Sequence, residues 1–388
     1  SDMASLNSAI NIYLTDSGGT GSLGNSQYLY VSVPDSSSTC GDLGLPSLPT
    51  GWSYHCVSST SSRNTDGTGW IPVKLASTSS GTPLGSLPVD PTNTTSSGYY
   101  YTYATDGNGG YELTMVPESQ KYTSNAASDG GLDPSMYETG NKLTLSAFAH
   151  GMVGYWPMNE GSGLTINDES GNGNNGTTTV GAGSGIAWES SGCINSSCPY
   201  FNDGTNYGYS LIPDTAGTST LNIGSSGLTI GGWFYIVASS ARGGIGKEPG
   251  DTTACASYGS GYSLVYNNDA RGFIFKITTN SGHYYLINWG QAPSLNKWYY
   301  VNGVYNSSSG NLSMYVNGVL QTITQLNQCT SGGMVGGTVS STQPFYLGVL
   351  SDAYYTQTFT INGYLNNIRV YNRALSAPQI QAIYNAKQ

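Results

Sequence analysis

The chain has 388 residues, which is long enough for two or more domains that each bury a core. Only 9 % of the residues are charged, while glycine (54) and tyrosine (31) are abundant, as is typical of an extracellular β-protein rather than a disordered chain. The net charge of −10, with only 12 lysines and arginines, argues against nucleic acid or an anionic membrane as a partner.

The first 145 residues predict one helix followed by a small sheet. Apolar residues at helical spacing predict a helix over residues 4–15, which the glycines after residue 17 end. Alternation predicts a strand over residues 27–34. Residues 98–103 and 111–116 predict two antiparallel strands joined by a glycine-rich turn.

This order of helix, loop, Leu87-Pro88-x-Asp90-Pro91 and tyrosine-rich hairpin resembles the globular part of type IV pilins and type II secretion pseudopilins. The resemblance covers about residues 4–145 and includes an acidic-glycine loop, Asp129-Gly130-Gly131. It implies an α+β module in which a helix packs on an antiparallel sheet. The hydrophobic segment that begins this helix in the family is absent, so we expect a truncated helix. A small, unrelated α+β extracellular domain is the alternative.

Residues 150–388 carry a different series of strand signals. The hairpin at residues 311–320 turns at Asn317-Gly318, a dipeptide that favours the tight turns between antiparallel strands. The other signals are an opening strand around Trp156, a Gly- and Asn-rich loop at 168–176, a central strand at 297–305, a closing strand at 362–375 and a helix at 376–386.

This series closely resembles a laminin-G-like domain of the concanavalin A-like lectin/glucanase superfamily. The resemblance implies an antiparallel β-sandwich of the jelly-roll type over residues 150–388, so that the whole chain is mainly β. Trp156, Trp233 and Trp298 lie in strand motifs of the family, and we expect all three in the core.

The six cysteines favour disulfides and export from the cytoplasm, because their spacing matches no zinc motif. Proximity and domain membership favour the pairs Cys40–Cys56, Cys193–Cys198 and Cys255–Cys329, although other pairings among six cysteines remain open.

No catalytic constellation is visible, so we expect that the chain is not an enzyme. Glycan-cleaving members of the superfamily carry paired carboxylates on one strand, and none of the seven glutamates has such a partner at that spacing. The three histidines belong to no Ser or Cys triad, and Gly243–Lys247 lacks the spacing of a phosphate-binding loop.

A glycan site combines aromatic platforms with hydrogen-bonding amides. Trp289 is the first candidate because loop residues flank it. For the other aromatic residues in strands, packing in the core is the alternative to ligand contact. The predicted glycan-binding residues are Trp289, Asn288, Gln291, Tyr284, Tyr258 and Tyr354.

Calcium is the expected cofactor, since laminin-G-like relatives often bind it in the loop after the opening strand. Relatives often carry Ile-Asp-Asp where this chain has Leu365-Asn366-Asn367, which lowers the available charge. Turn formation is the alternative role for these residues. The predicted ligands are Asp168, Asn172, Asn174, Asp203 and Asn366.

Together these features predict a monomeric fragment of a surface adhesin, a minor type IV pilin that presents a lectin-like module. Its expected partners are glycans or glycoproteins and other pilins of an extracellular filament, to which the missing N-terminal helix would anchor it. A secreted carbohydrate-binding module or glycoside hydrolase accessory protein is one alternative. A protein-binding laminin-G-like module is the other.

Overall fold

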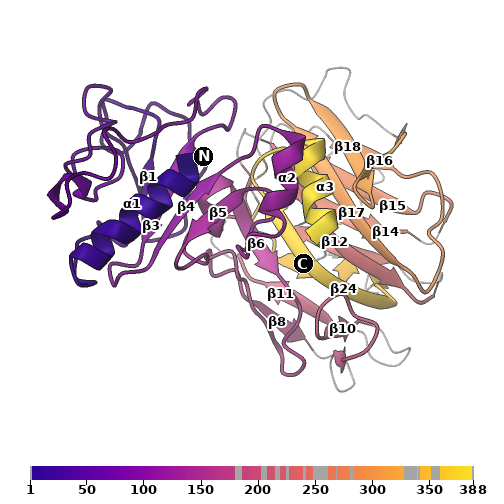
Figure 1. The fold of residues 1–388 in the computed structure, drawn as a ribbon. Coiled ribbons are helices and arrows are strands. Elements are labelled where there is room, and N and C mark those ends of the chain that lie inside the picture. The colour runs from indigo at the N-terminus through magenta and orange to yellow at the C-terminus, as the bar shows by residue number, and fades with distance from the viewer. Residues whose placement is uncertain are drawn as a thin grey trace. The chain divides into compact units, whose positions relative to one another are not determined.

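The computed structural model describes residues 2–179, 186–201, 208–214, 219–223, 227–238, 242–247, 261–267, 269–279, 284–326, 339, 341–350 and 359–386. The chain forms two compact units, Ser1–Gly151 and Met152–Gln388 (Figure 1). Strands dominate the second unit, and together with the five-stranded sheet of the first unit they confirm the predicted mainly β fold class of the chain.

The first unit contains one long helix and a sheet of five described strands in the order β2-β1-β3-β4-β5. Helix α1 is longer than predicted by two residues at its start. The elements are α1 (Asp2–Asp16), β1 (Tyr28–Val31), β2 (Ser53–His55), η1 (Leu75–Ser77), β3 (Tyr101–Thr105), β4 (Tyr111–Met115), α2 (Gln120–Ala126), β5 (Tyr137–Gly140) and η2 (Ala147–His150).

Helix α1 packs on one face of this sheet. Its residues Leu6 and Ile10 are fully buried in a cluster that includes Tyr103 and Leu113 of the β3–β4 hairpin. The sheet differs from the prediction in one respect, because β2 runs parallel to β1 while the other pairs are antiparallel.

The opposite face of the sheet has its own apolar cover. Val31 packs with Tyr100 and with the disulfide Cys40–Cys56, which joins the loop before β2 to the end of that strand. This confirms the first predicted pairing. Because both faces are covered, the predicted alternation in β1 does not separate buried from exposed side chains.

The second unit is a sandwich of two antiparallel sheets of eight and nine described strands. The eight-stranded sheet has the order β19-β18-β17-β12-β24-β10-β9, with β6 also paired to β24. Its strands are β6 (Met152–Trp156), β9 (Ala187–Glu189), β10 (Cys198–Tyr200), β12 (Leu228–Ile236), β17 (Trp298–Asn306), β18 (Asn311–Val316), β19 (Val319–Leu320) and β24 (Gly363–Tyr371).

The nine-stranded sheet has the order β20-β16-β15-β14-β13-β21-β11-β8-β7. Its strands are β7 (Thr165–Ile166), β8 (Gly176–Thr179), β11 (Tyr209–Ile212), β13 (Gly243–Lys247), β14 (Gly261–Tyr266), β15 (Phe273–Thr278), β16 (Tyr284–Asn288), β20 (Thr324–Leu326) and β21 (Phe345–Leu347). A separate pair is formed by β22 (Val349–Leu350) and β23 (Phe359–Thr360).

The core lies between the two sheets. Phe234 of β12 and Leu365 of β24 meet Phe273 and Phe275 of β15, and all four are fully buried. The predicted turn at Asn317-Gly318 is confirmed, since both residues have positive φ (52° and 79°) as this tight turn requires.

The closing helix α3 (Ala377–Ala386) covers part of the outer face of the eight-stranded sheet. Ser376 precedes it, and the Gln379 side chain accepts the Ser376 backbone N–H at 2.9 Å, one half of a capping box. Tyr384 of α3 packs on Trp233 and Tyr300, with ring centroids 5.6 and 6.1 Å apart.

Gly303 of β17 tests the packing of the core. Its Cα faces the ring of Phe275, and a Cβ at this position would overlap that ring. We expect Gly303→Ala to destabilise the sandwich by about 1–3 kcal/mol, the usual cost of overpacking.

Gly176→Ala in β8 is the matched control, because its Cβ would meet only ordinary contacts at 3.5 Å and beyond. Urea unfolding of both variants measures the difference. Equal midpoints for the two variants would contradict this packing of β17 on β15.

Candidate binding surface

Four aromatic side chains form a continuous row across the eight-stranded sheet. Trp298 of β17 pairs with Tyr235 of β12, which pairs with Tyr364 of β24, which in turn pairs with Tyr200 of β10. Successive ring centroids are 5.4, 5.5 and 4.9 Å apart. We call these four residues the aromatic row.

The aromatic row lies on the outer face of the sandwich. In a strand, neighbouring side chains point to opposite faces, and the neighbours Phe201, Phe234, Tyr299 and Leu365 all lie in the core. Each member of the row is half-buried, so part of each ring is open to solvent. The row thus offers a polar-edged aromatic surface rather than core packing.

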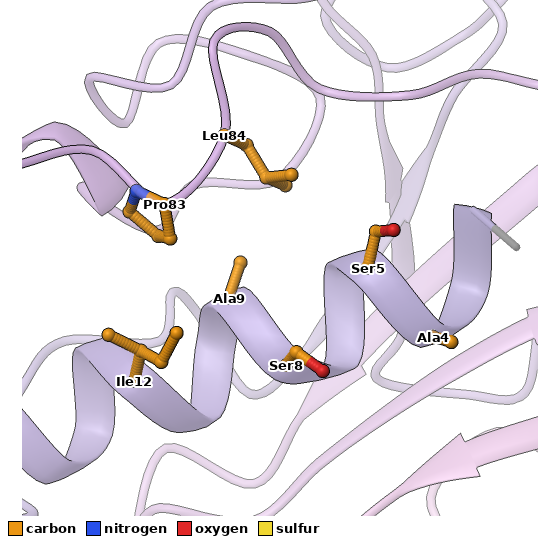
Figure 2. A pocket seen from close by; sticks show the side chains of 7 residues that line it. All are labelled: Ala4, Ser5, Ser8, Ala9, Ile12, Pro83 and Leu84. Carbon is orange, nitrogen blue, oxygen red and sulfur yellow. The ribbon is translucent and has the colours of Figure 1, made fainter.

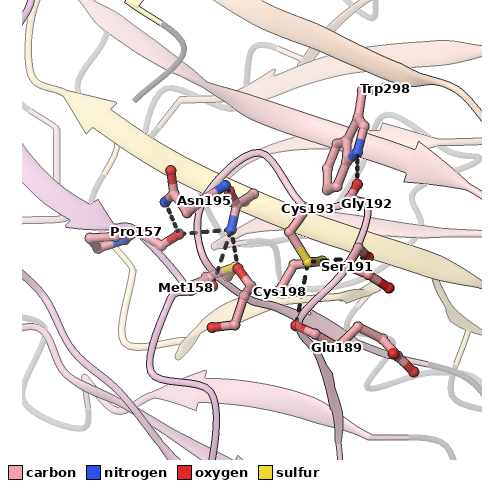
Figure 3. Close-up of a disulfide and its surroundings, with 11 residues drawn as sticks. Pro157, Met158, Glu189, Ser191, Gly192, Cys193, Asn195, Cys198 and Trp298 are labelled. Carbon is pink, nitrogen blue, oxygen red and sulfur yellow. Dashed lines mark hydrogen bonds between the residues drawn. A yellow bond between two sulfur atoms is a disulfide. The ribbon is translucent and has the colours of Figure 1, made fainter.

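A disulfide-closed loop lies beside the aromatic row. The indole N–H of Trp298 donates to the carbonyl of Gly192 at 2.7 Å, and Cys193 is bonded to Cys198 (Figure 3). This confirms the second predicted pairing. Cys255 and Cys329 lie outside the described residues. The hydrogen bond fixes the Trp298 ring before any ligand arrives.

The hydroxyl groups of the three tyrosines in the row differ in their hydrogen bonds. The Tyr200 hydroxyl donates to Asn362 Oδ1 at 2.7 Å, whereas the hydroxyls of Tyr235 and Tyr364 have no hydrogen-bond partner among the described residues. Partial burial, with the charge of Glu189 as a smaller cause, raises the pKa of Tyr364, so this hydroxyl stays protonated at neutral pH.

The expectation that Trp298 lies in the core is therefore wrong, whereas Trp156 is fully buried there. Trp233 is buried as well, but between the sheet and α3. Sequence reasoning missed Tyr200, Tyr235 and Tyr364. Each of these tyrosines is next to a core residue in the chain, which indicates that it points to the outer face. Only the pairing of the strands shows that the three tyrosines align with one another.

Trp289, the first predicted platform, is less open than expected. Its ring packs on Phe273 and Tyr299, and its indole N–H donates to Gln321 Oε1 at 3.0 Å. Asn288 is buried and precedes it in the chain, while Gln291 is exposed.

Of the remaining predicted glycan-binding residues, Tyr284 begins β16, opposite Thr278. Tyr258 and Tyr354 lie outside the described residues.

The predicted calcium loop after β6 is closed by its own hydrogen bonds. The Asp168 carboxylate accepts the backbone N–H groups of Tyr155, Ser170 and Asn174 at 2.8–2.9 Å. Asn174 donates to the carbonyl of Val153 at 2.8 Å. Burial raises the pKa of Asp168 in spite of these donors. The side chains hold the loop as a turn, which was the alternative role.

The Asn172 and Asn366 side chains also donate to backbone carbonyls. Asn172 Nδ2 donates to Met152, and Asn366 Nδ2 lies 3.0–3.2 Å from the carbonyls of Pro157, Met158 and Ser197. The amide N–H₂ of Asn366 thus occupies the point where these carbonyls meet. Asn172 Oδ1, by contrast, is buried without a hydrogen-bond partner among the described residues, and Asp203 lies outside them.

The first unit contains a second group of titratable side chains, the carboxyl cluster of Glu112, Asp129, Asp133 and Glu138. Asp129 and Glu138 are tied by backbone donors, since Asp129 accepts the N–H of Glu138 at 2.7 Å and Glu138 accepts that of Asp133 at 3.0 Å. Gly131 makes room for this cluster, because a Cβ there would overlap the Glu138 carboxyl.

Burial raises the pKa of each of three members of the carboxyl cluster. That of Asp129 rises to about 6, and the neighbouring carboxyls push that of Glu138 still further in the same direction. The pKa of Glu112 is raised too. Backbone donors hold Asp129 and Glu138 in place, while Glu112 Oε1 is buried without a hydrogen-bond partner in the described part of the chain.

A shallow groove of about 350 Å³ runs along α1 (Figure 2). It carries no charged side chain, so it offers little to orient a polar ligand. Its lining residues are Ala4, Ser5, Ser8, Ala9, Ile12, Pro83 and Leu84.

The glycine-rich stretch before Lys247 forms β13 rather than a phosphate-binding loop, and Lys247 is buried in an ion pair with Asp214. Within the described residues, no helix has the length and apolar character needed to cross a membrane.

The carboxyl cluster predicts a pH-dependent stability. Carboxyls with raised pKa in the folded state stabilise it fully below their unfolded pKa of about 4, and this contribution is lost as the pH rises through the folded values. We expect a lower urea midpoint at about pH 8 than at about pH 5.

Glu138→Gln removes one titrating group and should reduce this difference, whereas the exposed Glu118→Gln should leave it unchanged. An unchanged pH dependence in Glu138→Gln would contradict the assignment of raised pKa values to this cluster.

Thermal unfolding can test the calcium site that the sequence predicts. Because the Asp168 carboxylate and the Asn366 amide are already hydrogen-bonded within the protein, we expect the same midpoint in calcium chloride and in chelator. A higher midpoint in calcium would contradict this reading and would point to ligands such as Asp203.

Comparison with known proteins places the sandwich in a family. Residues 203–381 match the family described as the concanavalin A-like lectin/glucanases superfamily, of laminin-G type. No curated protein matches the chain.

Three similar solved structures share low identity with the chain. Domain 4 of AbnA, an extracellular GH43 arabinanase from Geobacillus stearothermophilus, in complex with arabinotriose, is 15 % identical with a TM-score of 0.40, over 61 % of this chain and 98 % of that domain. The binding domain of botulinum neurotoxin serotype C1 is 16 % identical with a TM-score of 0.43, over 61 % of this chain and 52 % of the toxin domain.

The binding domain of Paraclostridial Mosquitocidal Protein 1 is 15 % identical with a TM-score of 0.41, over 61 % of this chain and 52 % of that domain. The chain thus spans about half the length of the two toxin domains. The match over residues 203–381, together with the two-sheet sandwich, supports a laminin-G-like domain of the concanavalin A-like lectin/glucanase superfamily in the second unit.

Proposed function

We propose that the chain is an extracellular adhesin that binds glycans through the aromatic row of its laminin-G-like domain. The observation that carries this proposal is the alignment of four half-exposed rings on adjacent strands, with centroids about one strand spacing apart. Sugar rings present apolar C–H faces that stack on aromatic side chains and hydroxyls that require hydrogen-bond partners.

Binding rather than bond cleavage is the activity that these residues support. The four residues of the aromatic row carry no carboxyl group, and the charge of Glu189 adds to burial in raising the pKa of Tyr364. Glycoside hydrolysis needs two carboxyls that face each other across the scissile bond. Glu112 and Glu138 interact but are buried in the first unit. Glu160 and Glu169 interact in the second unit, where neither belongs to the aromatic row.

The first unit would act as the support of the adhesin, as in a minor type IV pilin. The helix α1 packed on one face of the sheet and the loop containing Leu87-Pro88-x-Asp90-Pro91 support this assignment. The two disulfides suit an oxidising, extracellular location. Other pilins of a surface filament would then be its partners, and weak glycan sites would gain strength from many copies.

The proposal predicts the effect of Trp298→Ala on glycan binding. A panel of immobilised glycans and polysaccharides identifies a ligand of the full chain, and the variant should bind it roughly tenfold more weakly, because it loses the largest stacking surface of the row. Trp298→Phe should bind with intermediate strength.

Tyr209→Ala is the matched control, since Tyr209 is a half-buried tyrosine that pairs with Tyr346 on the outer face of the other sheet. It should bind normally. Loss of binding in Tyr209→Ala but not in Trp298→Ala would overturn the proposal. A protein ligand with no glycan hit would favour the protein-binding alternative, and release of reducing sugar from polysaccharide would favour an enzyme.

A further inference from the structure

We infer that the aromatic row takes an uncharged, linear glycan that lies across the strands, and that the Tyr235 and Tyr364 hydroxyls hydrogen-bond it at its centre. This inference rests on the proposed function and adds the class of ligand and the division of roles within the site.

The length of the row favours a chain of sugars over a single terminal sugar. Trp298, Tyr235, Tyr364 and Tyr200 stand on four adjacent strands, so the row spans three strand spacings, or roughly 14 Å. A single pyranose ring covers only one of these positions. Consecutive sugars of an extended chain can place one apolar face after another along the row.

The charges around the row favour an uncharged ligand. Ala187 of β9 pairs with Tyr200 of β10, so Glu189, two residues along β9, lies on the face of the sheet that carries the row. Its charge adds to burial in raising the pKa of Tyr364. The neighbouring cation, Lys297, lies over the ring of Tyr299, 5.4 Å from its centroid, and not over the row. The Glu189 carboxylate beside the row would repel uronic or sialic acid carboxylates.

The hydrogen bonds of the row divide its members into two kinds. Trp298 donates to Gly192, and Tyr200 donates to Asn362, so these outer rings are held in place by the protein. The hydroxyls of Tyr235 and Tyr364 lie between them and have no partner among the described residues. The outer rings therefore serve for stacking, while the two central hydroxyls are available to sugar hydroxyls.

The test measures binding of defined oligosaccharides to the full chain by calorimetry. The probes are cello-, manno- and xylo-oligosaccharides, each from the monosaccharide to the hexasaccharide, with oligogalacturonides of the same lengths as anionic counterparts. Affinity for one neutral series should rise with length until the row is filled, and it should not depend on salt. Oligogalacturonides should bind more weakly at every length.

The double variant Tyr235→Phe, Tyr364→Phe keeps all four rings and should bind the best neutral probe roughly three- to tenfold more weakly. Tyr209→Phe on the other sheet is its control and should bind normally. Equal affinity for monosaccharide and hexasaccharide, tighter binding of oligogalacturonides, or an unaffected double variant would each overturn the inference.

These failures are distinguishable from failure of the proposed function. If Trp298→Ala still abolishes the binding of an anionic or terminal sugar, the row remains the glycan site and only the ligand class is wrong. If glycans bind but Trp298→Ala has no effect, both the proposed function and the inference fail.

Discussion

The antiparallel register of β17, β12, β24 and β10 is the constraint on which the rest of the second unit depends. Side chains alternate between the faces of a strand, so a shift of one residue would exchange Phe234 and Leu365 with Tyr235 and Tyr364. The large apolar area that the core residues bury fixes the register. The same register aligns the four rings of the aromatic row on the opposite face.

The loop closed by Cys193–Cys198 and the side-chain amide of Asn366 stabilise the region beside the aromatic row. The loop closed by Cys193–Cys198 reaches β17, because Gly192 accepts the Trp298 indole N–H, and it reaches β24, because Asn195 donates its backbone N–H to Asn366 Oδ1 at 3.0 Å. Asn366 in turn binds the carbonyls of Pro157 and Met158. A network of amides therefore ties the loop to the outer face of the sheet. Such positioning would lower the entropy cost of stacking in the proposed glycan site.

Much of the fold follows from the sequence, because its signals are local. The α1 periodicity, the Asn317-Gly318 turn and the start of α3 at Ser376 each depend on residues close in the chain. The two confirmed disulfides join cysteines 16 and 5 residues apart, and their short separation made them predictable. The parallel pairing of β2 with β1 depends on distant residues, and the sequence does not reveal it.

The aromatic row, the proposed binding surface, could not be predicted in the same way. Tyr200 and Tyr364 are separated by more than 160 residues, and only pairing between strands brings them to adjacent positions. A Trp in a strand motif is as compatible with the core as with the surface, so the motif around Trp298 does not reveal that this side chain lies outside. The loop residues around Trp289 favour a ligand contact, but they do not reveal that its ring packs on Phe273 and Tyr299. The hydrogen bonds of the Asn366 amide could not be predicted either, because its carbonyl partners come from two loops that are distant in the sequence.

The most direct measurement separates the two tryptophans by NMR. The chain labelled with ¹⁵N-tryptophan has seven tryptophans, and the variants Trp298→Phe and Trp289→Phe assign the two indole N–H signals of interest. Titration with the neutral oligosaccharide that binds best should shift the Trp298 signal, which belongs to the aromatic row, and leave the Trp289 signal in place. A shift of Trp289 with an unchanged Trp298 would contradict the account.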